Sequence, residues 1–288
     1  MNKKIFLSDG TEIGNMGIGT WYMGDSPNNR DEEIKSIRYA LDHGVTTIDT
    51  AEMYGNGRSE LLVGEAIKGY DRKKLFIISK VLPNNAGKNR IFQACENTLK
   101  RLGTDYLDLY LLHWRGFVPF EETIECMEEL KRKGKIRRWG VSNMDIYDME
   151  EILECPDGEN CCVNQVLYHL GSRGIEYSLK PFTDNHNIPT IAYCPVAQGG
   201  RLRKKLLDSA AVKNIAEKYN ITPIQVLLSF VLNQENMIAI PKAAQVKHMK
   251  ENIECLDIKL SQEDLEILNK EFPAPTRKMP LDLSLIHI

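Results

Sequence analysis

Four side chains with complementary chemistry lie at or near the ends of three successive apolar runs. Asp49 and Lys80 each end one run, His113 directly follows a third, and Tyr54 lies in the segment after Asp49. A phenol can donate a proton, a neighbouring ammonium group favours its phenolate, and a neutral imidazole can polarise a carbonyl oxygen by hydrogen bonding. Together, the four side chains predict reduction of a carbonyl group, with Tyr54 as the proton donor to the substrate oxygen.

Each side chain also has an ordinary structural interpretation. Asp49 is compatible with a helix cap, Tyr54 with a surface aromatic, and His113 with a satisfied core histidine. Lys80 follows Leu-Phe-Ile-Ile-Ser, so we expect it to point inward and to need a carboxylate partner, for which Asp49 is the obvious candidate. In that arrangement Asp49 keeps Lys80 charged, and Lys80 lowers the pKa of Tyr54 from its reference value of about 10.

Two other chemistries compete with this hypothesis. A strand-end lysine with a lowered pKa can form a Schiff base, as in aldolase-type barrels, but an adjacent Asp49 favours the protonated amine at Lys80. Metal-assisted hydrolysis is disfavoured because the six histidines are scattered, without a His-x-His or His-Glu-x-x-His pair.

Repeated strand-helix units are expected to position these residues. Nearly continuous apolar runs are typical of strands buried on both faces of a parallel sheet. Helix-like segments lie between them, and the strand ends from the second to the seventh recur at intervals of roughly 25 to 33 residues. The pattern predicts an α/β fold, a (β/α)8 TIM barrel. Its expected strands are 16–20, 45–49, 75–80, 107–112, 138–141, 163–166, 190–193 and 237–240, and its clearest helices are 31–43, 88–102, 120–133 and 223–232.

Further segments complete the predicted barrel. Runs 4–7 and 11–13 around Asp9-Gly10 predict a β-hairpin that caps its bottom. The longer interval before the last strand predicts an additional loop and helix at 203–219. A doubly wound sheet is the competing architecture, and it is disfavoured because no Gly-x-Gly-x-x-Gly motif opens a helix after a strand.

The chain is predicted to be one domain over residues 1–282, ending in a short tail. Residues 283–288, Leu-Ser-Leu-Ile-His-Ile, equal the translation of a widely used transposase sequencing adapter, CTG TCT CTT ATA CAC ATC. We therefore interpret them as a non-native scar. Amplifying the gene together with its downstream DNA tests this hypothesis, because the same codons in genomic sequence would contradict it.

Composition narrows the expected partners and compartment. The 288 residues are 42% hydrophobic and 27% charged, and the net charge is -3 without a basic tract. This balance favours small-molecule ligands over nucleic acid or a membrane surface. The first apolar run is too short for a signal peptide, and the seven cysteines lack zinc-type spacing. We expect a cytoplasmic protein with reduced thiols, monomeric, with a dimer as the alternative.

The same residues lie within an ordered set of short motifs that spans nearly the whole chain. They are Gly-Thr-Trp at 19–21, Asp-Thr-Ala-Glu-Met-Tyr at 49–54, Ser-Lys at 79–80, Leu-His-Trp at 112–114, Gly-Val-Ser-Asn at 140–143, Asn-Gln at 164–165 and Ile-Pro-Lys at 240–242. This set resembles the aldo-keto reductase family. The resemblance implies NAD(P)H-dependent oxidoreductase activity, with Asp49, Tyr54, Lys80 and His113 as the catalytic tetrad.

The resemblance also implies a cofactor site. Ser142, Asn143 and Gln165 would hold the nicotinamide carboxamide, and Tyr193 would stack on the ring. The other implied contacts are Gly19, Thr20, Asp49, Pro195, Lys242, His248 and Asn252. His248 stands where many members have arginine, and Ala243 replaces a frequent serine or threonine. NADPH is the expected cofactor, because Lys242 provides a cation for its 2′-phosphate. NADH is the alternative, because neutral histidine binds a phosphate less firmly than arginine.

Aromatic residues are expected to form the substrate pocket. Trp21 and Trp114 would line it beside Tyr54 and His113, with Tyr22 or Met23 near its rim, although the same side chains are compatible with packing at the barrel mouth. The segments after Tyr193 and at the end of the chain are short relative to those of longer animal-type members. An open, permissive pocket is therefore expected.

Four local motifs are similar to small bacterial members of the family, including methylglyoxal-reductase-like ones: Glu-Met at 52–53 beside Tyr54, His-Trp-Arg-Gly at 113–116, Tyr-Cys-Pro-Val-Ala-Gln-Gly-Gly at 193–200 and Phe-Pro-Ala-Pro-Thr-Arg-Lys-Met-Pro at 272–280. They predict reduction of small aldehydes, 2-oxoaldehydes such as methylglyoxal, or ketones. The alternative is a non-enzymatic NADPH-sensing binding module, resembling the potassium-channel β subunits. The intact tetrad favours the enzyme.

Overall fold

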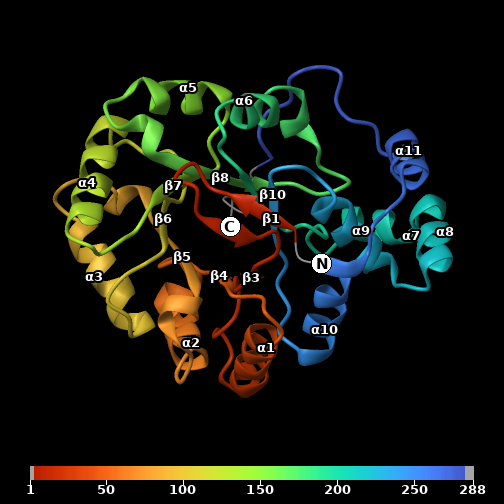
Figure 1. Cartoon of the computed structure of the whole chain (residues 1–288), viewed down its shortest axis with the longest axis horizontal. Helices are drawn as coiled ribbons and strands as arrows, with labels where there is room; N and C mark the ends of the chain where they lie inside the picture. The colour runs from red at the N-terminus through yellow and green to blue at the C-terminus, as the bar shows by residue number, and fades with distance from the viewer. Residues whose placement is uncertain (1–2, 283–288) are drawn as a thin grey trace.

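Eight parallel strands form the centre of the molecule. The computed structural model describes residues 3–282, so the proposed scar at 283–288 lies outside the described residues. Helices surround the strands on the outside (Figure 1). The strands are hydrogen-bonded in chain order and comprise β3 (Ile18–Gly19), β4 (Thr47–Asp49), β5 (Phe76–Val81), β6 (Leu109–Leu112), β7 (Trp139–Ser142), β8 (Cys161–Leu167), β9 (Thr190–Tyr193) and β10 (Met237–Ile240). The predicted (β/α)8 barrel is confirmed.

Backbone contacts between the first and last strands close the barrel. Met16 forms a parallel bridge with Ala239, and the Gly17 N–H donates to the Ala239 carbonyl at 2.8 Å. The Gly19 N–H donates to the Pro241 carbonyl at 3.1 Å. These contacts explain why the expected first strand, 16–20, includes residues on both sides of β3.

Gly19 is tightly confined at this closure. A Cβ added there would lie 2.6 Å from the carbonyl oxygen of Ile240, and this backbone atom cannot rotate away. We expect Gly19→Ala to lower the free energy of unfolding by about 1–3 kcal/mol, as forced overpacking does. Urea unfolding measures the change. Gly199→Ala is the control, because no atom lies within 4 Å of its added Cβ; equal stability of the two variants would contradict the prediction.

The outer layer follows each strand with amphipathic helices. In α3, buried positions recur every three or four residues, which turns one face toward the barrel. A capping box between Thr222 and Gln225, with Pro223 at the first position, begins α9. The helices around the barrel are α1 (Arg30–Asp42), α2 (Arg58–Ala66), α3 (Ile91–Leu102), α4 (Phe120–Arg132), α5 (Ile146–Glu154), α6 (Leu179–Asn185), α9 (Pro223–Leu232) and α10 (Val246–Glu254).

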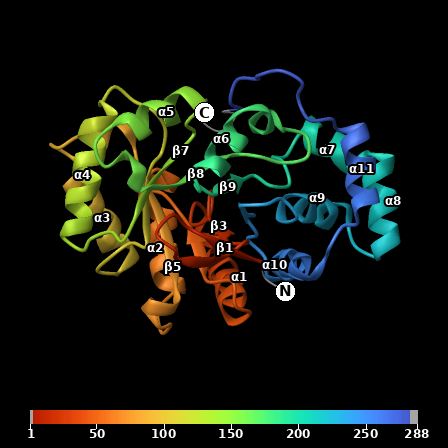
Figure 2. The same ribbon diagram turned by 45° about the horizontal axis from the view of Figure 1, so that its top comes forward.

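Three further helices gather on one side of the barrel (Figure 2). They are α7 (Arg201–Asp208), α8 (Ala210–Tyr219) and α11 (Gln262–Glu271). The single helix expected within 203–219 is wrong in detail, because Ser209 interrupts it. The Ser209 hydroxyl accepts the Val212 N–H at 3.2 Å and so begins α8 as a separate helix.

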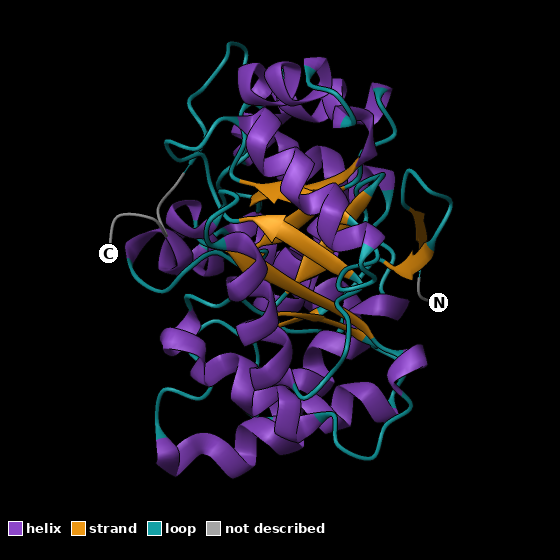
Figure 3. Ribbon diagram, turned by 90° about the vertical axis from the view of Figure 1, so that its left-hand side faces the viewer, coloured by secondary structure: helices purple, strands orange, loops and turns teal. Residues whose placement is uncertain are grey.

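An N-terminal hairpin fills the end of the barrel opposite the C-terminal ends of the strands. It consists of β1 (Lys4–Phe6) and β2 (Glu12–Gly14), which pair antiparallel and lie against one end of the strands (Figure 3). Ile5, Leu7 and Ile13 are buried in the same apolar cluster as the inward-facing strand residues. The hairpin cap predicted from the sequence is therefore confirmed, and a ligand site belongs at the other end, where the strands terminate.

Candidate active site

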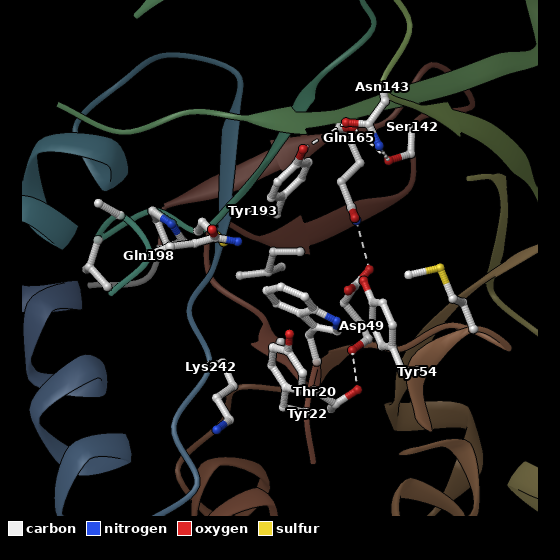
Figure 4. A pocket seen from close by; sticks show the side chains of 18 of the residues that line it. Thr20, Tyr22, Asp49, Tyr54, Ser142, Asn143, Gln165, Tyr193, Gln198 and Lys242 are labelled. Carbon is white, nitrogen blue, oxygen red and sulfur yellow. Dashed lines mark hydrogen bonds between the residues drawn. The ribbon is translucent and has the colours of Figure 1, made fainter. Parts of the chain in front are cut away.

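A pocket of about 420 Å³ opens at the C-terminal ends of the strands. Most residues predicted to bind cofactor or substrate line it (Figure 4). They are Gly19, Thr20, Trp21, Asp49, Tyr54, His113, Trp114, Ser142, Asn143, Gln165, Tyr193, Pro195 and Lys242. Strand ends far apart in the sequence thus converge on one cavity.

Lys80 lies beneath the pocket and is completely buried. Its Nζ donates to Asp49 Oδ2 at 2.8 Å, to the Thr50 carbonyl at 2.9 Å and to Tyr54 Oη at 3.1 Å. These three acceptors match the three N–H donors of an ammonium group. Because Lys80 donates to the Tyr54 oxygen, the phenol hydrogen is free to be donated to another group.

Asp49 is fixed on its remaining sides. Its Oδ1 accepts the Gln165 Nε2–H at 2.8 Å, and its backbone carbonyl accepts the Thr20 hydroxyl at 2.8 Å (Figure 4). Its carboxylate therefore binds side chains of the barrel interior rather than capping a helix. His113 is buried, but its Nδ1 has no hydrogen-bond partner among the described residues, unlike a satisfied core histidine.

The electrostatics of Tyr54 differ from the sequence-based expectation. Burial of its hydroxyl and the nearby Asp49 charge raise the pKa of Tyr54 well above its ordinary value. The expected lowering by Lys80 is wrong in direction, because desolvation disfavours the phenolate. Tyr54 therefore stays protonated at neutral pH and can serve as an acid there.

Burial also lowers the pKa values of the neighbouring Lys80 and His113 side chains. It lowers the pKa of Lys80, while Asp49 and then Glu60 oppose that change by favouring the ammonium form. Burial and the Lys80 charge together hold the pKa of His113 well below its usual range. The imidazole is therefore neutral at pH 7, which is the form that can orient a carbonyl without carrying charge.

The predicted carboxamide-binding residues form a connected network. Asn143 donates from Nδ2 to the His113 carbonyl and to Ser142 Oγ, each at 3.1 Å, and its Oδ1 accepts the Tyr193 hydroxyl at 2.8 Å (Figure 4). The Ser142 hydroxyl donates to the Gln165 carbonyl at 2.9 Å. Ser142 Oγ and the side-chain oxygens of Asn143 and Gln165 can still accept a hydrogen bond, which suits the NH₂ group of an amide ligand.

The opposite side of the pocket carries basic and amide groups. Gln198 and Lys242 lie across the cavity from Tyr54 (Figure 4), and Arg203 also lines it. The buried Nε2 of Gln198 has no hydrogen-bond partner among the described residues. Gln198 and Arg203 were not predicted from the sequence as pocket residues; the available signal was their place in the segment that follows β9, on either side of Gly199-Gly200.

Aromatic groups form the outer wall. Trp21 and Tyr22 lie with ring centroids 4.1 Å apart, and Trp114 lies 4.8 Å from the His113 ring. Tyr22 is 51% exposed at the rim, whereas Met23, the other rim candidate, is buried in the core. Other lining residues that the sequence analysis did not assign to a ligand site are Met53, Cys194, Val196, Ala197, Gly199 and Ile240.

Two predicted phosphate contacts lie outside this lining. His248 is exposed on α10, with its Nδ1 2.9 Å from Glu251 Oε2. Asn252 is buried on the same helix. The structure therefore gives His248 an acidic partner on its own helix, which competes with any bound phosphate.

Within residues 3–282 there is no group of three or more His, Cys, Asp or Glu side chains that could hold a metal ion. No helix in that range is long and apolar enough to span a bilayer. All seven cysteines lie in that range as free thiols.

Comparison with known proteins identifies the family. The model of the aldo/keto reductase family matches residues 15–271. The chain is 50% identical to methylglyoxal reductase YeaE of Escherichia coli (strain K12), covering 98% of this chain and 99% of that protein. It is 36% identical to the glyoxal reductase of Bacillus subtilis (strain 168), covering 92% of each chain.

A solved structure agrees with this result. An aldo/keto reductase from Klebsiella pneumoniae, in complex with NADP and acetate, superposes with a TM-score of 0.95 at 49% identity, covering 98% of this chain and 99% of that one. The chain belongs to the aldo/keto reductase family.

Proposed function

We propose that this protein reduces small aldehydes, and 2-oxoaldehydes such as methylglyoxal in particular, to alcohols, with NADPH as the hydride donor and Tyr54 as the proton donor. Family membership confirms the predicted reaction class, NADP-dependent carbonyl reduction. The observation that carries the proposed roles is the contact of buried Lys80 with both Asp49 and Tyr54 at the base of the pocket. The intact tetrad argues against a binding module without turnover.

The pocket residues fit a nicotinamide dinucleotide. Tyr193 offers an aromatic face, and the acceptor oxygens of Ser142, Asn143 and Gln165 suit a carboxamide. The unpartnered Nε2 of Gln198 supplies a donor on the side of the cavity away from Tyr54 (Figure 4). When bound, such a cofactor supplies the hydride.

The chain's own residues then supply binding and proton transfer. Nδ1 of His113 is buried, so Nε2 is the ring nitrogen that can hydrogen-bond the substrate carbonyl. Tyr54 donates its hydroxyl proton to that oxygen. Lys80 is already hydrogen-bonded to Tyr54 Oη and stabilises the resulting phenolate, while Asp49 holds the ammonium in place.

The proposed substrate class rests on the pocket wall and on relatives. Trp21, Tyr22, Met53 and Trp114 present a largely apolar surround that admits small organic carbonyl compounds. The two relatives are named for methylglyoxal and for glyoxal. An aldehyde carbon beside a second carbonyl is electron-poor, which favours hydride addition.

The decisive experiment measures NADPH oxidation by the purified protein. The substrates are methylglyoxal, aromatic aldehydes, aldoses and diketones, each also tested with NADH. We expect the highest kcat/KM with methylglyoxal and NADPH. Tight NADPH binding without oxidation by any of these compounds would instead support the binding module.

Lys242 is expected to determine the preference for NADPH. We expect Lys242→Met to raise the Kd of NADPH by about 10-fold or more, because a charge-assisted contact worth roughly 1.5–3 kcal/mol is lost. The Kd of NADH should change little, since NADH lacks the 2′-phosphate. Fluorescence titration with both cofactors measures the ratio.

His248→Gln is the companion variant to Lys242→Met. We expect a smaller change in the NADPH Kd, because Glu251 already binds the imidazole. A larger effect at His248 than at Lys242 would reverse this assignment of the phosphate contact.

We also infer a cytoplasmic monomer. The compartment is supported by seven cysteines that are free thiols, of which Cys95, Cys126, Cys161, Cys162 and Cys255 are buried. Cell fractionation tests the compartment, and light scattering during size-exclusion chromatography tests the oligomeric state.

A further inference from the structure

Glu60 is a fully buried carboxylate that lies behind the pocket rather than in its lining. It sits near the start of α2, and its Oε1 accepts the Ser79 hydroxyl at 2.6 Å. Ser79 directly precedes Lys80 in β5. Successive strand residues point to opposite faces, so Ser79 faces α2 while Lys80 faces the barrel interior. Glu60 therefore holds the strand that carries Lys80 from its outer side.

The second oxygen of Glu60 reaches a different element. Its Oε2 lies 2.5 Å from Arg101 Nε of α3, and the Arg101 side chain is only 24% exposed. Arg101 also packs over Gly57, where an added Cβ would lie 2.5 Å from Arg101 Cδ. Gly57 ends the short 3₁₀ turn η2 (Tyr54–Gly57), which begins with Tyr54. Arg101 thus covers the turn that carries the proton donor.

The residue before Glu60 reinforces the same attachment. Ser59 is also fully buried. Its hydroxyl donates to Thr20 Oγ1 at 2.8 Å and accepts the Thr50 hydroxyl at 3.1 Å. Thr50 is the residue whose carbonyl accepts a hydrogen bond from Lys80. The start of α2 is therefore bound to the segments that follow β3 and β4 and to β5 itself, which carries Lys80.

The charges near Lys80 give Glu60 an electrostatic effect as well. The titratable groups around Lys80 are Asp49, Tyr54, His113 and Glu60. Burial lowers the pKa of Lys80, and the negative charges of Asp49 and then Glu60 oppose this change. A buried ion pair is weak evidence for added stability, since apolar replacements are often as stable. The position of Glu60 between Ser79 and Arg101 therefore needs an explanation other than added stability.

We propose that Glu60 is a positioning residue of the reductase, which through Ser79 and Arg101 fixes the strand bearing Lys80 relative to the turn bearing Tyr54. This inference rests on the roles proposed above for Tyr54 and Lys80. Glu60 touches neither substrate nor cofactor. It acts by keeping the Lys80–Tyr54 contact at hydrogen-bonding distance, in a site where a displacement of about 1 Å can reduce the rate roughly 100-fold.

Glu60→Gln tests the proposal, because glutamine keeps the shape and removes the charge. With NADPH and methylglyoxal we expect kcat to fall by about 10-fold or more, while the NADPH Kd is nearly unchanged. The basic limb of the kcat–pH profile should move to lower pH. The sign follows from the loss of one of the two carboxylates that favour the Lys80 ammonium form. That ammonium is then lost at a lower pH.

Glu65→Gln is the matched control on the same helix. Glu65 pairs with Arg30 at the surface, so its loss should move neither kcat nor the pH profile. Ser79→Ala removes one arm of the attachment without removing a charge, and it serves if Glu60→Gln does not fold, as judged by circular dichroism. We expect a smaller decrease in kcat for Ser79→Ala, without a shift in the pH profile.

Three outcomes would overturn the inference. The first is a folded Glu60→Gln variant with wild-type kcat and pH profile. The second is a Glu60→Gln variant with lower thermal stability but unchanged kcat and pH profile. Either result would leave Glu60 only a structural role. If Glu60→Gln does not fold, unchanged kcat in Ser79→Ala would also overturn the inference. An inactive wild-type protein would refute the proposed function together with this inference, whereas an active wild type with an unaffected variant would refute this inference alone.

Discussion

Replacing Tyr54 with phenylalanine is expected to lower kcat by about 10²–10⁴-fold, the usual contribution of general acid catalysis, while leaving the NADPH Kd nearly unchanged. The variant keeps the aromatic ring and loses only the hydroxyl that Lys80 contacts at 3.1 Å. Without this hydroxyl, no side chain at the proton-donor position can transfer a proton to the substrate oxygen. Single-turnover kinetics with methylglyoxal measure the chemical step, and fluorescence titration measures cofactor binding.

Tyr22→Phe is the control for this prediction. Tyr22 also lines the pocket but is half exposed at its rim, so loss of its hydroxyl should alter KM more than kcat. Turnover of Tyr54→Phe within about threefold of the wild type, well below the usual catalytic contribution, would refute the proton-donor role. A large rise in the NADPH Kd would instead assign Tyr54 to cofactor binding.

Replacing Lys80 with methionine should have the second large effect, and it should act on stability as well as on rate. Lys80 and Asp49 form a buried ion pair at 2.8 Å. Removing one partner leaves an uncompensated buried charge, which typically destabilises a protein by about 3–5 kcal/mol. We expect a loss of that order in urea unfolding, together with a kcat near that of Tyr54→Phe, because the phenolate loses its stabilising ammonium group.

The double variant Asp49→Asn with Lys80→Met separates the two effects. Removing the second charge should restore much of the stability, since a neutral pair no longer has to be desolvated. Activity should not return. Recovery of activity in the double variant would show that the ion pair serves folding alone, and Lys80→Met with wild-type stability would contradict its burial as a charged group.

The barrel and the tetrad could be predicted because their signals are local. A strand buried on both faces is a continuous apolar run, so the positions of Asp49, Lys80 and His113 at strand ends follow directly from the sequence. Those predictions of fold and family are confirmed. The roles of the individual side chains stay predictions until variants are measured.

Some helices escaped prediction for identifiable reasons. Gly64 lies inside α2 and breaks its pattern, because glycine is a poor helix former. In the structure, a Cβ at Gly64 would lie 2.7 Å from the carbonyl oxygen of Arg101. Glycine is therefore required by the close approach of α3 to α2, and such a contact between distant segments leaves no local signal.

The features of the site that were not predicted also depend on contacts between segments that are distant in the sequence. The direction of the Tyr54 pKa change depends on how completely its hydroxyl is desolvated, which residue types alone do not reveal. Gln198 and Arg203 reach the pocket only because of the path that the loop after β9 takes. The proposed role of Glu60 depends on its contacts with Ser79 and Arg101, which form only when α2 packs against β5 and α3.

The hairpin that fills the lower end of the barrel has a consequence for the order of events in turnover. Ile5, Leu7 and Ile13 pack into the barrel interior, so among the described residues the catalytic groups are reached from the mouth. When two ligands enter through the same opening, the one that binds deeper must bind first and dissociate last. The closed lower end therefore predicts an ordered binding and release of cofactor and substrate, which product-inhibition kinetics test.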